Sequence, residues 1–115
     1  MSVKTFHIPI QMFTGTEVHA LFFDDAAPYV KQYGDGGACT GMKIHRGSFH
    51  VEMRFRMTED GIGKGRFLAF LVHEVIHAVQ FLAQHFNVRD DEFDAYTADF
   101  LVAEILKRDP SLRTR

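Results

Sequence analysis

Two histidines and a glutamate stand at a spacing that suits metal-assisted hydrolysis, in the segment His73-Glu74-Val75-Ile76-His77. If this segment is helical, residues four apart project to the same side, so His73 and His77 can bind one metal ion together. Glu74 then sits beside the ion, where it can act as a general base on a metal-bound water. The motif therefore predicts a metal site, with zinc as the expected ion. The alternative is a pair of core histidines that are hydrogen-bonded to the backbone.

A catalytic zinc site also needs a third protein ligand and an open fourth position. No histidine follows His77 at the close spacing of the longer H-E-x-x-H-x-x-G-x-x-H motif, but the next segment offers the carboxylates Glu92, Asp94 and Asp99. Glu92 follows His77 by fifteen residues, which is enough for one helix to end and a second helix to return. Glu92 is therefore the expected third ligand, with Asp94 and Asp99 as alternatives.

Four other side chains are candidates for the site. Tyr96 lies one turn after Glu92, where it either donates a hydrogen bond to the developing oxyanion or is an amphipathic core tyrosine. Asp99 continues the same stripe and either orients a zinc-bound imidazole or is solvated. His45 and His50 fall in a predicted hairpin, where they either face the substrate cleft or lie exposed on the sheet.

The remaining histidines, His7, His19 and His85, have no partner at a recognisable spacing, so no role is expected for them. Cys39 has no obvious neighbouring base and is not expected to be a nucleophile. The glycine-rich segment 61–65 lacks both the G-x-G-x-x-G spacing and the Gly-Lys-Ser/Thr ending of a phosphate loop. We expect it to be a connector beside the cleft.

The composition is that of one globular domain. The chain has 115 residues, 46% hydrophobic and 24% charged, which supply one core over residues 1–108, with 109–115 expected as a flexible tail. The formal net charge of −2 gives no bulk attraction to nucleic acid or anionic membranes. A single cysteine excludes an internal disulfide, and the longest uninterrupted apolar run, 67–72, is too short to span a bilayer. We expect a cytoplasmic protein without nucleic-acid or membrane partners.

The first half of the chain has mainly strand-like patterns. Residues 6–10 alternate between apolar and polar, and Pro9 restricts this strand to a sheet edge. Residues 17–23 form a second, buried strand. Residues 25–34 are expected to form a short helix with an acidic N-cap and a terminal glycine, and 34–41 a loop.

A β-hairpin is the best-defined element of this half. Residues 42–46 and 49–55 flank Gly47-Ser48, a two-residue connection of type II′. In this register His45 faces His50. One side of the hairpin is apolar and is expected to pack on the core, while the other is polar and meets water or a cleft.

The second half is helical. Residues 66–86 are apolar almost all round, as expected of a helix through the centre of a small domain. Its polar exceptions form one stripe: His73, His77, Gln80 and Gln84. Asn87 can end this helix, and Asp90 or Asp91 can cap the next one, which is expected over 92–107.

Two motifs and their context resemble a known family. The segments HEVIHAVQFL (73–82) and EFDAYTADFL (92–101) are similar to the HExxHA helix and the E-x-x-A-Y-type second helix of small zincin-like proteins encoded by tailed phages and prophages. The upstream order is also similar: a strand ending in Asp24-Asp25, a short helix, a glycine-rich stretch and a hairpin that leads to the metal helix. The resemblance covers roughly residues 17–106.

The expected fold class is α+β: a small, mostly antiparallel sheet of three or four strands with one short helix, packed on the HExxH helix and an antiparallel C-terminal helix. The resemblance implies that this is a minimal gluzincin fold, with Zn²⁺ bound by His73, His77 and Glu92. It also implies a metallopeptidase in which Glu74 is the general base. Tyr96 is the second expected catalytic residue.

Three functions remain open at this point. A zinc peptidase would act on a peptide or protein substrate, and a hydrolase of a non-peptide amide would use the same site. A non-catalytic binding module would keep zinc for stability and bind a host or virion protein in the cytoplasm of a phage-infected cell. Glu74 separates the enzymes from the binding module, because a structural zinc site needs the histidines but not that carboxylate.

Overall fold

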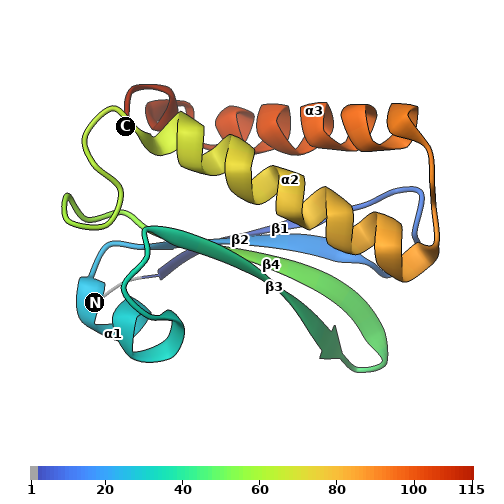
Figure 1. Cartoon of the computed structure of the whole chain (residues 1–115), viewed down its shortest axis with the longest axis horizontal. Helices are drawn as coiled ribbons and strands as arrows, with labels where there is room; N and C mark the ends of the chain where they lie inside the picture. The colour runs from blue at the N-terminus through green and yellow to red at the C-terminus, as the bar shows by residue number, and fades with distance from the viewer. Residues whose placement is uncertain (1–2) are drawn as a thin grey trace.

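The computed structural model describes residues 3–115 and has an α+β fold in which two helices lie across one face of a small sheet (Figure 1). The strands are β1 (Val3–Pro9), β2 (Glu17–Phe23), β3 (Ala38–His45) and β4 (Ser48–Arg56). The helices are α1 (Ala26–Tyr33), α2 (Phe67–Phe86) and α3 (Asp91–Arg108), followed by a short 3-10 helix, η1 (Pro110–Thr114). The predicted α+β class is confirmed at this level.

The sheet is mixed, with the strand order β1-β2-β4-β3. β1 pairs antiparallel with β2, and β3 pairs antiparallel with β4, whereas the central strands β2 and β4 are parallel. β2 and β4 are parallel because α1 and β3 lie between them in the chain. β3 runs in the opposite direction, so it brings the chain back to the end of the sheet at which β2 begins, and β4 starts there. β1 and β3 are therefore the two edges of the sheet.

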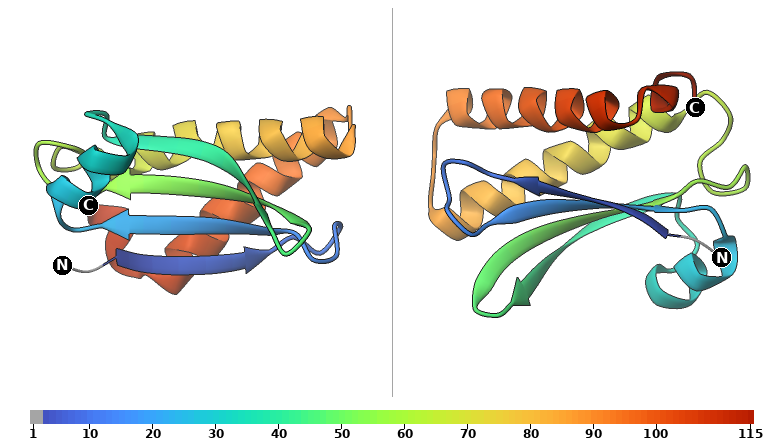
Figure 2. Two further views of the ribbon diagram at one scale, coloured as in Figure 1. Left: turned by 90° about the horizontal axis from the view of Figure 1, so that it is seen from below. Right: turned by 180° about the vertical axis from the view of Figure 1, so that it is seen from behind.

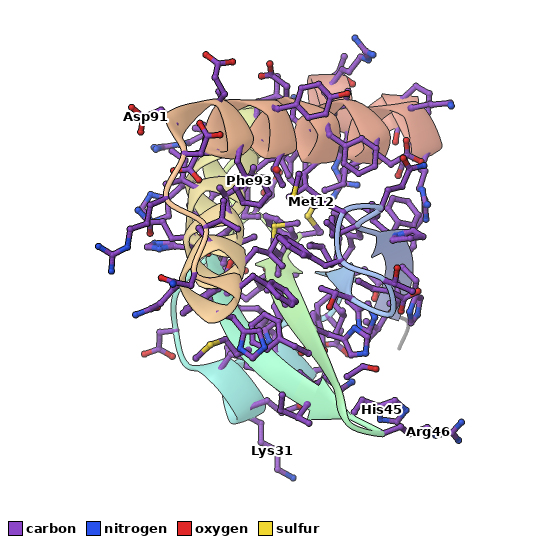
Figure 3. All side chains as sticks on the ribbon, turned by 90° about the vertical axis from the view of Figure 1, so that its right-hand side faces the viewer. Met12, Lys31, His45, Arg46, Asp91 and Phe93 are labelled. Atoms are coloured by element: carbon purple, nitrogen blue, oxygen red, sulfur yellow. The ribbon has the colours of Figure 1, made fainter. Side chains whose placement is uncertain are left out.

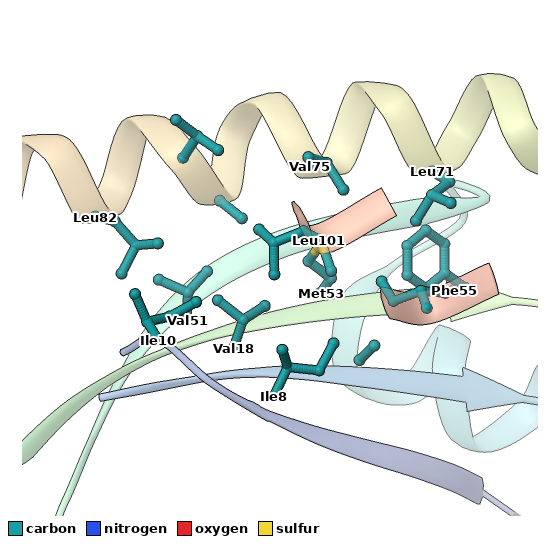
Figure 4. Close-up of a cluster of buried hydrophobic side chains, with 14 of the residues drawn as sticks. Ile8, Ile10, Val18, Val51, Met53, Phe55, Leu71, Val75, Leu82 and Leu101 are labelled. Carbon is teal, nitrogen blue, oxygen red and sulfur yellow. The ribbon is translucent and has the colours of Figure 1, made fainter. Parts of the chain in front are cut away.

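The helices are divided between the two faces of the sheet. α2 and α3 cover one face, whereas α1 lies against one end of the other face (Figure 2). α2 contacts β3 and β4, and α3 crosses towards β1. The core lies between these two helices and the sheet (Figure 4), and its buried members include Ile8, Val18, Val51, Met53, Phe55, Leu71, Val75, Leu82 and Leu101.

Capping residues fix the ends of the two long helices. Asn87 has a positive φ of 56° and ends α2, and the Asp90 side chain accepts a hydrogen bond from the Glu92 backbone N–H at 2.9 Å, which begins α3. Both helices match their predicted ranges within one residue at each end. The length and hydropathy of α2 would also suit a membrane span, but core helices share these properties, and one side of α2 is buried against the sheet.

The turn of the β3–β4 hairpin differs from the prediction. Arg46 and Gly47 are the two turn residues, and both have positive φ, 51° and 79°. Positive φ at both central positions is the mark of a type I′ turn, so the type II′ turn predicted one residue later is wrong. The pairing is shifted by two residues, and Lys43, not His45, lies opposite His50. Each side chain keeps its predicted face, because side chains alternate with a period of two.

β3 is longer and more exposed than predicted. Residues 38–41, expected as loop, pair with β4. Near the turn, Met42 and Ile44 are 57% and 66% exposed, although their cross-strand partners Val51 and Phe49 are buried. This end of the hairpin curves away from α2 (Figure 1), so the apolar side of the edge strand lacks a cover.

The C-terminal segment packs onto the fold. Residues 109–115 are expected as a flexible tail, but Pro110–Thr114 form η1, in which Leu112 is buried. Asp109 caps this turn through the backbone N–H of Ser111 and accepts a hydrogen bond from Lys4 at 2.9 Å. The expectation fails because one apolar residue in a polar segment leaves no periodic pattern.

Candidate functional site

His73 and His77 lie one turn apart on the exposed side of α2. Their Nε2 atoms are 3.1 Å apart, and the two rings meet edge to face. Two nitrogens bound to one tetrahedral zinc ion at about 2.0–2.1 Å are about 3.3 Å apart. The pair therefore has nearly the separation that a shared zinc ion requires.

The packing of α2 explains why the histidines point outward. The side of α2 that faces the sheet is apolar and buried, and includes Leu71, Val75, Ala78 and Leu82. His73 and His77 fall outside this side because successive residues are rotated by about 100° around a helix. Since both are exposed, they are not core histidines.

Glu74 takes a different direction from the two histidines. It is only 4% exposed and lies where α2 meets β3. Thr40 on β3 donates a hydrogen bond from Oγ1 to Glu74 Oε1 at 2.8 Å. The edge strand thus holds the carboxylate at the base of the histidine-bearing turn of α2.

Glu92 and Tyr96, the expected third ligand and oxyanion donor, lie in a different groove. They line it together with Met12, between the first turns of α3 and the loop after β1 (Figure 3), and no residue of α2 lines this groove. Within residues 3–115, no carboxylate, thiol or third imidazole joins His73 and His77 at ligand distance. The structure therefore does not bring Glu92 to the histidine pair.

The alternative carboxylates, Asp94 and Asp99, also lie on α3. Asp94 is exposed in the first turn of the helix. Asp99 lines a shallow groove between α2 and α3 that Val72 and Ile76 also line, and each of these two residues directly precedes one of the histidines. Of the three carboxylates considered as third ligands, Asp99 is thus the one that lines a groove together with residues of α2.

His45 and His50 lie away from the histidine pair. His45 is exposed at the tip of the hairpin (Figure 3). His50 is buried on the face of the sheet opposite α2 and α3, where its Nδ1 accepts a hydrogen bond from the Glu17 backbone N–H at 3.0 Å. Neither is placed to polarise a carbonyl bound at His73 and His77.

A second cluster of candidate ligands lies on that opposite face. His7 on β1 and His19 on β2 are cross-strand partners, and Glu17 lies two residues before His19 on the same face. Glu17 Oε1 is 3.0 Å from His19 Nε2 and 3.6 Å from His7 Nδ1. The hydrogen bond with His19 lowers the pKa of Glu17, and burial lowers the pKa of His19. Near neutral pH the cluster therefore holds a carboxylate beside a mainly uncharged imidazole.

The spacing of His7 and His19 in the sequence gives no sign of this cluster. They meet because β1 and β2 pair in a register that places residue 7 opposite residue 19. One signal was available: a hairpin centred on Phe13 puts these two residues opposite each other. This prediction is possible only if both strands are recognised from the sequence and the loop between them is taken to be centred on Phe13.

No protein-family model matches the chain, and neither the curated proteins nor the solved structures include a significant match to it. The likeness to zincin-like phage proteins therefore rests on the sequence motifs and element order alone. Function is inferred from the side-chain geometry.

Proposed function

We propose that the protein is a zinc-dependent hydrolase of peptide bonds whose site is built on His73, Glu74 and His77. The observation that carries this proposal is the histidine pair itself: both side chains are exposed, and their Nε2 atoms are 3.1 Å apart. Glu74, the residue that follows His73, is a buried carboxylate. When bound, Zn²⁺ would lower the pKa of a coordinated water towards neutrality and polarise the scissile carbonyl.

Glu74 is the general base in this proposal. Thr40 donates to one carboxylate oxygen of Glu74, which orients the group and leaves its other oxygen to take a proton from the attacking water. The same oxygen then returns the proton to the leaving amine. The scissile bond must therefore lie close to the junction of α2 and β3.

The free edge of β3 is the proposed substrate-binding element. Because β3 is the last strand of the sheet, its outer backbone groups can pair with an extended peptide. Met42 and Ile44 are exposed on this strand and offer apolar contacts to substrate side chains. A peptide added to this edge would pass close to α2 near Thr40, where the bond to Glu74 joins the two elements, and would leave α2 towards Met42 and Ile44, where the hairpin curves away.

A gluzincin-like site also requires a third protein ligand. Glu92 and Tyr96 line a groove to which α2 does not contribute, whereas Asp99 lines one that α2 shares. Among the carboxylates of α3, Asp99 is therefore the better placed to join the histidine pair. Tyr96 has no part in the proposed mechanism.

The first test is the zinc content of the purified protein, measured by mass spectrometry. His77→Ala is expected to lose one zinc per chain relative to the wild type, and Asp99→Ala the same amount. Glu92→Ala is expected to keep the wild-type content. Equal zinc content in the wild type and in His77→Ala would overturn the metal site on α2.

The second test separates catalysis from metal binding. Glu74→Gln keeps the shape of the side chain and an acceptor for Thr40, but removes the base. Hydrolysis of a quenched fluorescent peptide library is expected to fall at least about 100-fold, with unchanged zinc content. Glu92→Gln is the matched control and is expected to retain full activity. Full activity in Glu74→Gln would exclude this mechanism.

A non-catalytic binding module is the second candidate, and one observation favours it. Glu74 already has a structural partner in Thr40, as expected of a residue that only braces α2 against β3. In this function zinc is structural, and the free edge of β3 binds a protein partner such as a host or virion protein. The wild type would then hydrolyse neither peptides nor other amides, and Glu74→Gln would bind its partner as the wild type does.

A further inference from the structure

We propose that His7, Glu17 and His19 form a second metal site, which binds a divalent first-row transition metal ion such as Zn²⁺ on the face of the sheet opposite α2 and α3. This site is separate from the HExxH segment and does not depend on the hydrolase function. In the part of the chain that the structure describes, these three residues are the only such group whose ligand atoms all lie within 4.8 Å of one another.

Two of the three donor separations are close to those of a metal site, and the third, between the two imidazoles, is within 4.8 Å. Glu17 Oε1 lies 3.0 Å from His19 Nε2 and 3.6 Å from His7 Nδ1. Zinc binds imidazole nitrogen and carboxylate oxygen at about 2.0–2.2 Å, which puts the donors of a tetrahedral site about 3.3–3.6 Å apart. Small side-chain movements are therefore enough to place an ion among the three donors.

Two of the ligands are held in place by His50. His19 is 7% exposed, and its ring stacks on the His50 ring at a centroid distance of 5.1 Å. His50 Nδ1 accepts the hydrogen bond from the Glu17 backbone N–H, which fixes the main chain at Glu17. Such support lowers the entropy cost of assembling the ligands around an ion.

His7 completes the site and leaves it open to solvent. Its side chain is 58% exposed on the edge strand β1, and its ring centroid lies 4.3 Å from that of His19. An ion can therefore enter from solvent, and water can fill the positions that the protein does not supply. The site thus combines one buried ligand with an accessible entrance.

The donor set selects the class of ion. Two imidazoles and one carboxylate suit Zn²⁺ and other divalent transition metals. Ca²⁺ and Mg²⁺ prefer sites made of oxygen ligands, and here Glu17 is the only oxygen donor of the three. Cu⁺ prefers sulfur ligands, and the cluster has none.

The ion would fasten the edge strand to the sheet. His7 belongs to β1, whereas Glu17 and His19 belong to β2, so an ion held by all three joins the two strands through their side chains. A ligand that binds only the folded state raises the melting temperature. Metal binding is therefore expected to show as thermal stabilisation as well as direct binding.

The experiment is a titration of the variant His73→Ala/His77→Ala, which lacks the pair on α2. Zn²⁺ is the ligand, and Co²⁺ serves as a spectroscopic probe. We expect one bound metal per chain, visible absorption from nitrogen-ligated Co²⁺ and a higher Tm with metal. Adding His7→Ala or Glu17→Gln to this variant is expected to weaken binding by at least about 10-fold.

His45→Ala, added to the same variant, is the matched control, because His45 is an exposed histidine on the same face of the sheet but outside the cluster. It is expected to leave binding and the Tm shift unchanged, and circular dichroism checks that every variant is folded. The proposal fails if the starting variant binds no metal, or if His7→Ala and Glu17→Gln bind it as tightly as His45→Ala does. Neither result depends on whether the protein hydrolyses peptides.

Discussion

The two histidine clusters are assembled by different elements. His73 and His77 meet through a single helix, because residues at i and i+4 share a face of any α-helix. His7 and His19 meet through the pairing of two strands, which depends on the register set by the loop between them. A ligand pair on a helix is therefore visible in local spacing, whereas a ligand pair on a sheet becomes visible only once the register is known.

The clusters also differ in what each one lacks. The pair on α2 is exposed and has no third ligand at hand among residues 3–115, but it adjoins Glu74, which Thr40 orients. The cluster on the sheet has three donors, one of them buried, and the neighbouring carboxylate of Glu52, the cross-strand partner of His19, is already paired with Arg54 at 2.8 Å. The cluster on the sheet is therefore better suited to retaining a metal ion, and the pair on α2 is better suited to catalysis.

The largest expected effect separates the clusters by activity. His77→Ala is expected to lower peptide hydrolysis more than about 100-fold, since losing even a hydrogen-bond partner of a metal-bound histidine costs about 10–100-fold. His7→Ala is expected to leave the rate unchanged. Steady-state rates with excess zinc test both variants. A similar loss in His7→Ala would mean that the sheet cluster takes part in the chemistry.

The next effect tests whether one core supports both clusters. Leu71 on α2 and Ile8 on β1 are fully buried. Leu71→Ala and Ile8→Ala are each expected to lower the free energy of unfolding by about 2–5 kcal/mol while keeping one cooperative transition. Urea denaturation followed by circular dichroism measures this. The control Leu68→Ala, at an exposed position of α2, should change it by less than about 1 kcal/mol. Two separate transitions would show that the clusters belong to independent units.

A smaller effect concerns the link between α2 and the edge strand. Thr40→Val removes the hydrogen bond to Glu74 and is expected to lower the free energy of unfolding by about 1–3 kcal/mol, because a buried carboxylate loses its partner. Hydrolysis should also slow, while metal binding by the sheet cluster should not change. Thr40→Ser keeps the hydroxyl and should behave as the wild type. Wild-type stability and rate in Thr40→Val would show that this bond does not support the α2 site.

The smallest effect concerns Asp109, which follows α3 and pairs with Lys4 on β1, the strand that also carries His7. Hydrogen bonds from Ser111, chiefly, and from Lys4 lower the pKa of Asp109. A carboxyl group whose pKa is lowered in the folded state stabilises the fold at pH values above its unfolded-state pKa of about 3.9. This stabilisation is lost as the pH falls through the folded-state pKa. Asp109→Asn should therefore cost less than about 1 kcal/mol near neutral pH.

In thermal melts, the difference in Tm between the wild type and Asp109→Asn should shrink on acidification. A difference that grows as the pH falls would contradict the assigned pKa shift.

Local signals were sufficient for the helical half of the chain. Asn87 tolerates the left-handed conformation that ends a helix, and Asp90 can accept the first backbone hydrogen bond of the next, so single residues predict the ends of α2 and α3. The strand Glu17–Phe23 is also predicted with its full range, because its apolar run is bounded by turn-forming residues.

Non-local geometry is not encoded in these signals. Glu92 follows His77 closely enough for a returning helix, but it lies in the first turn of α3, next to the loop that follows the end of α2. The part of α3 that shares a groove with residues 72–76 of α2 is residues 98–103, about two turns further along. The turn at Arg46 is missed for a different reason, since a positive φ is uncommon for arginine. In both cases the tertiary arrangement overrides what the local pattern favours.

The parallel pairing of β2 with β4 also bears on the order in which the chain folds. β1–β2 and β3–β4 are hairpins closed by short loops, whereas Glu17 and His50, which pair across the centre of the sheet, are 33 residues apart. Closing this longer segment is expected to limit the folding rate. The cluster of His7, Glu17 and His19 lies wholly within the first hairpin, so a metal ion could hold that hairpin closed before the sheet is complete. Stopped-flow refolding of the His73→Ala/His77→Ala variant should then be faster with Zn²⁺ than without it.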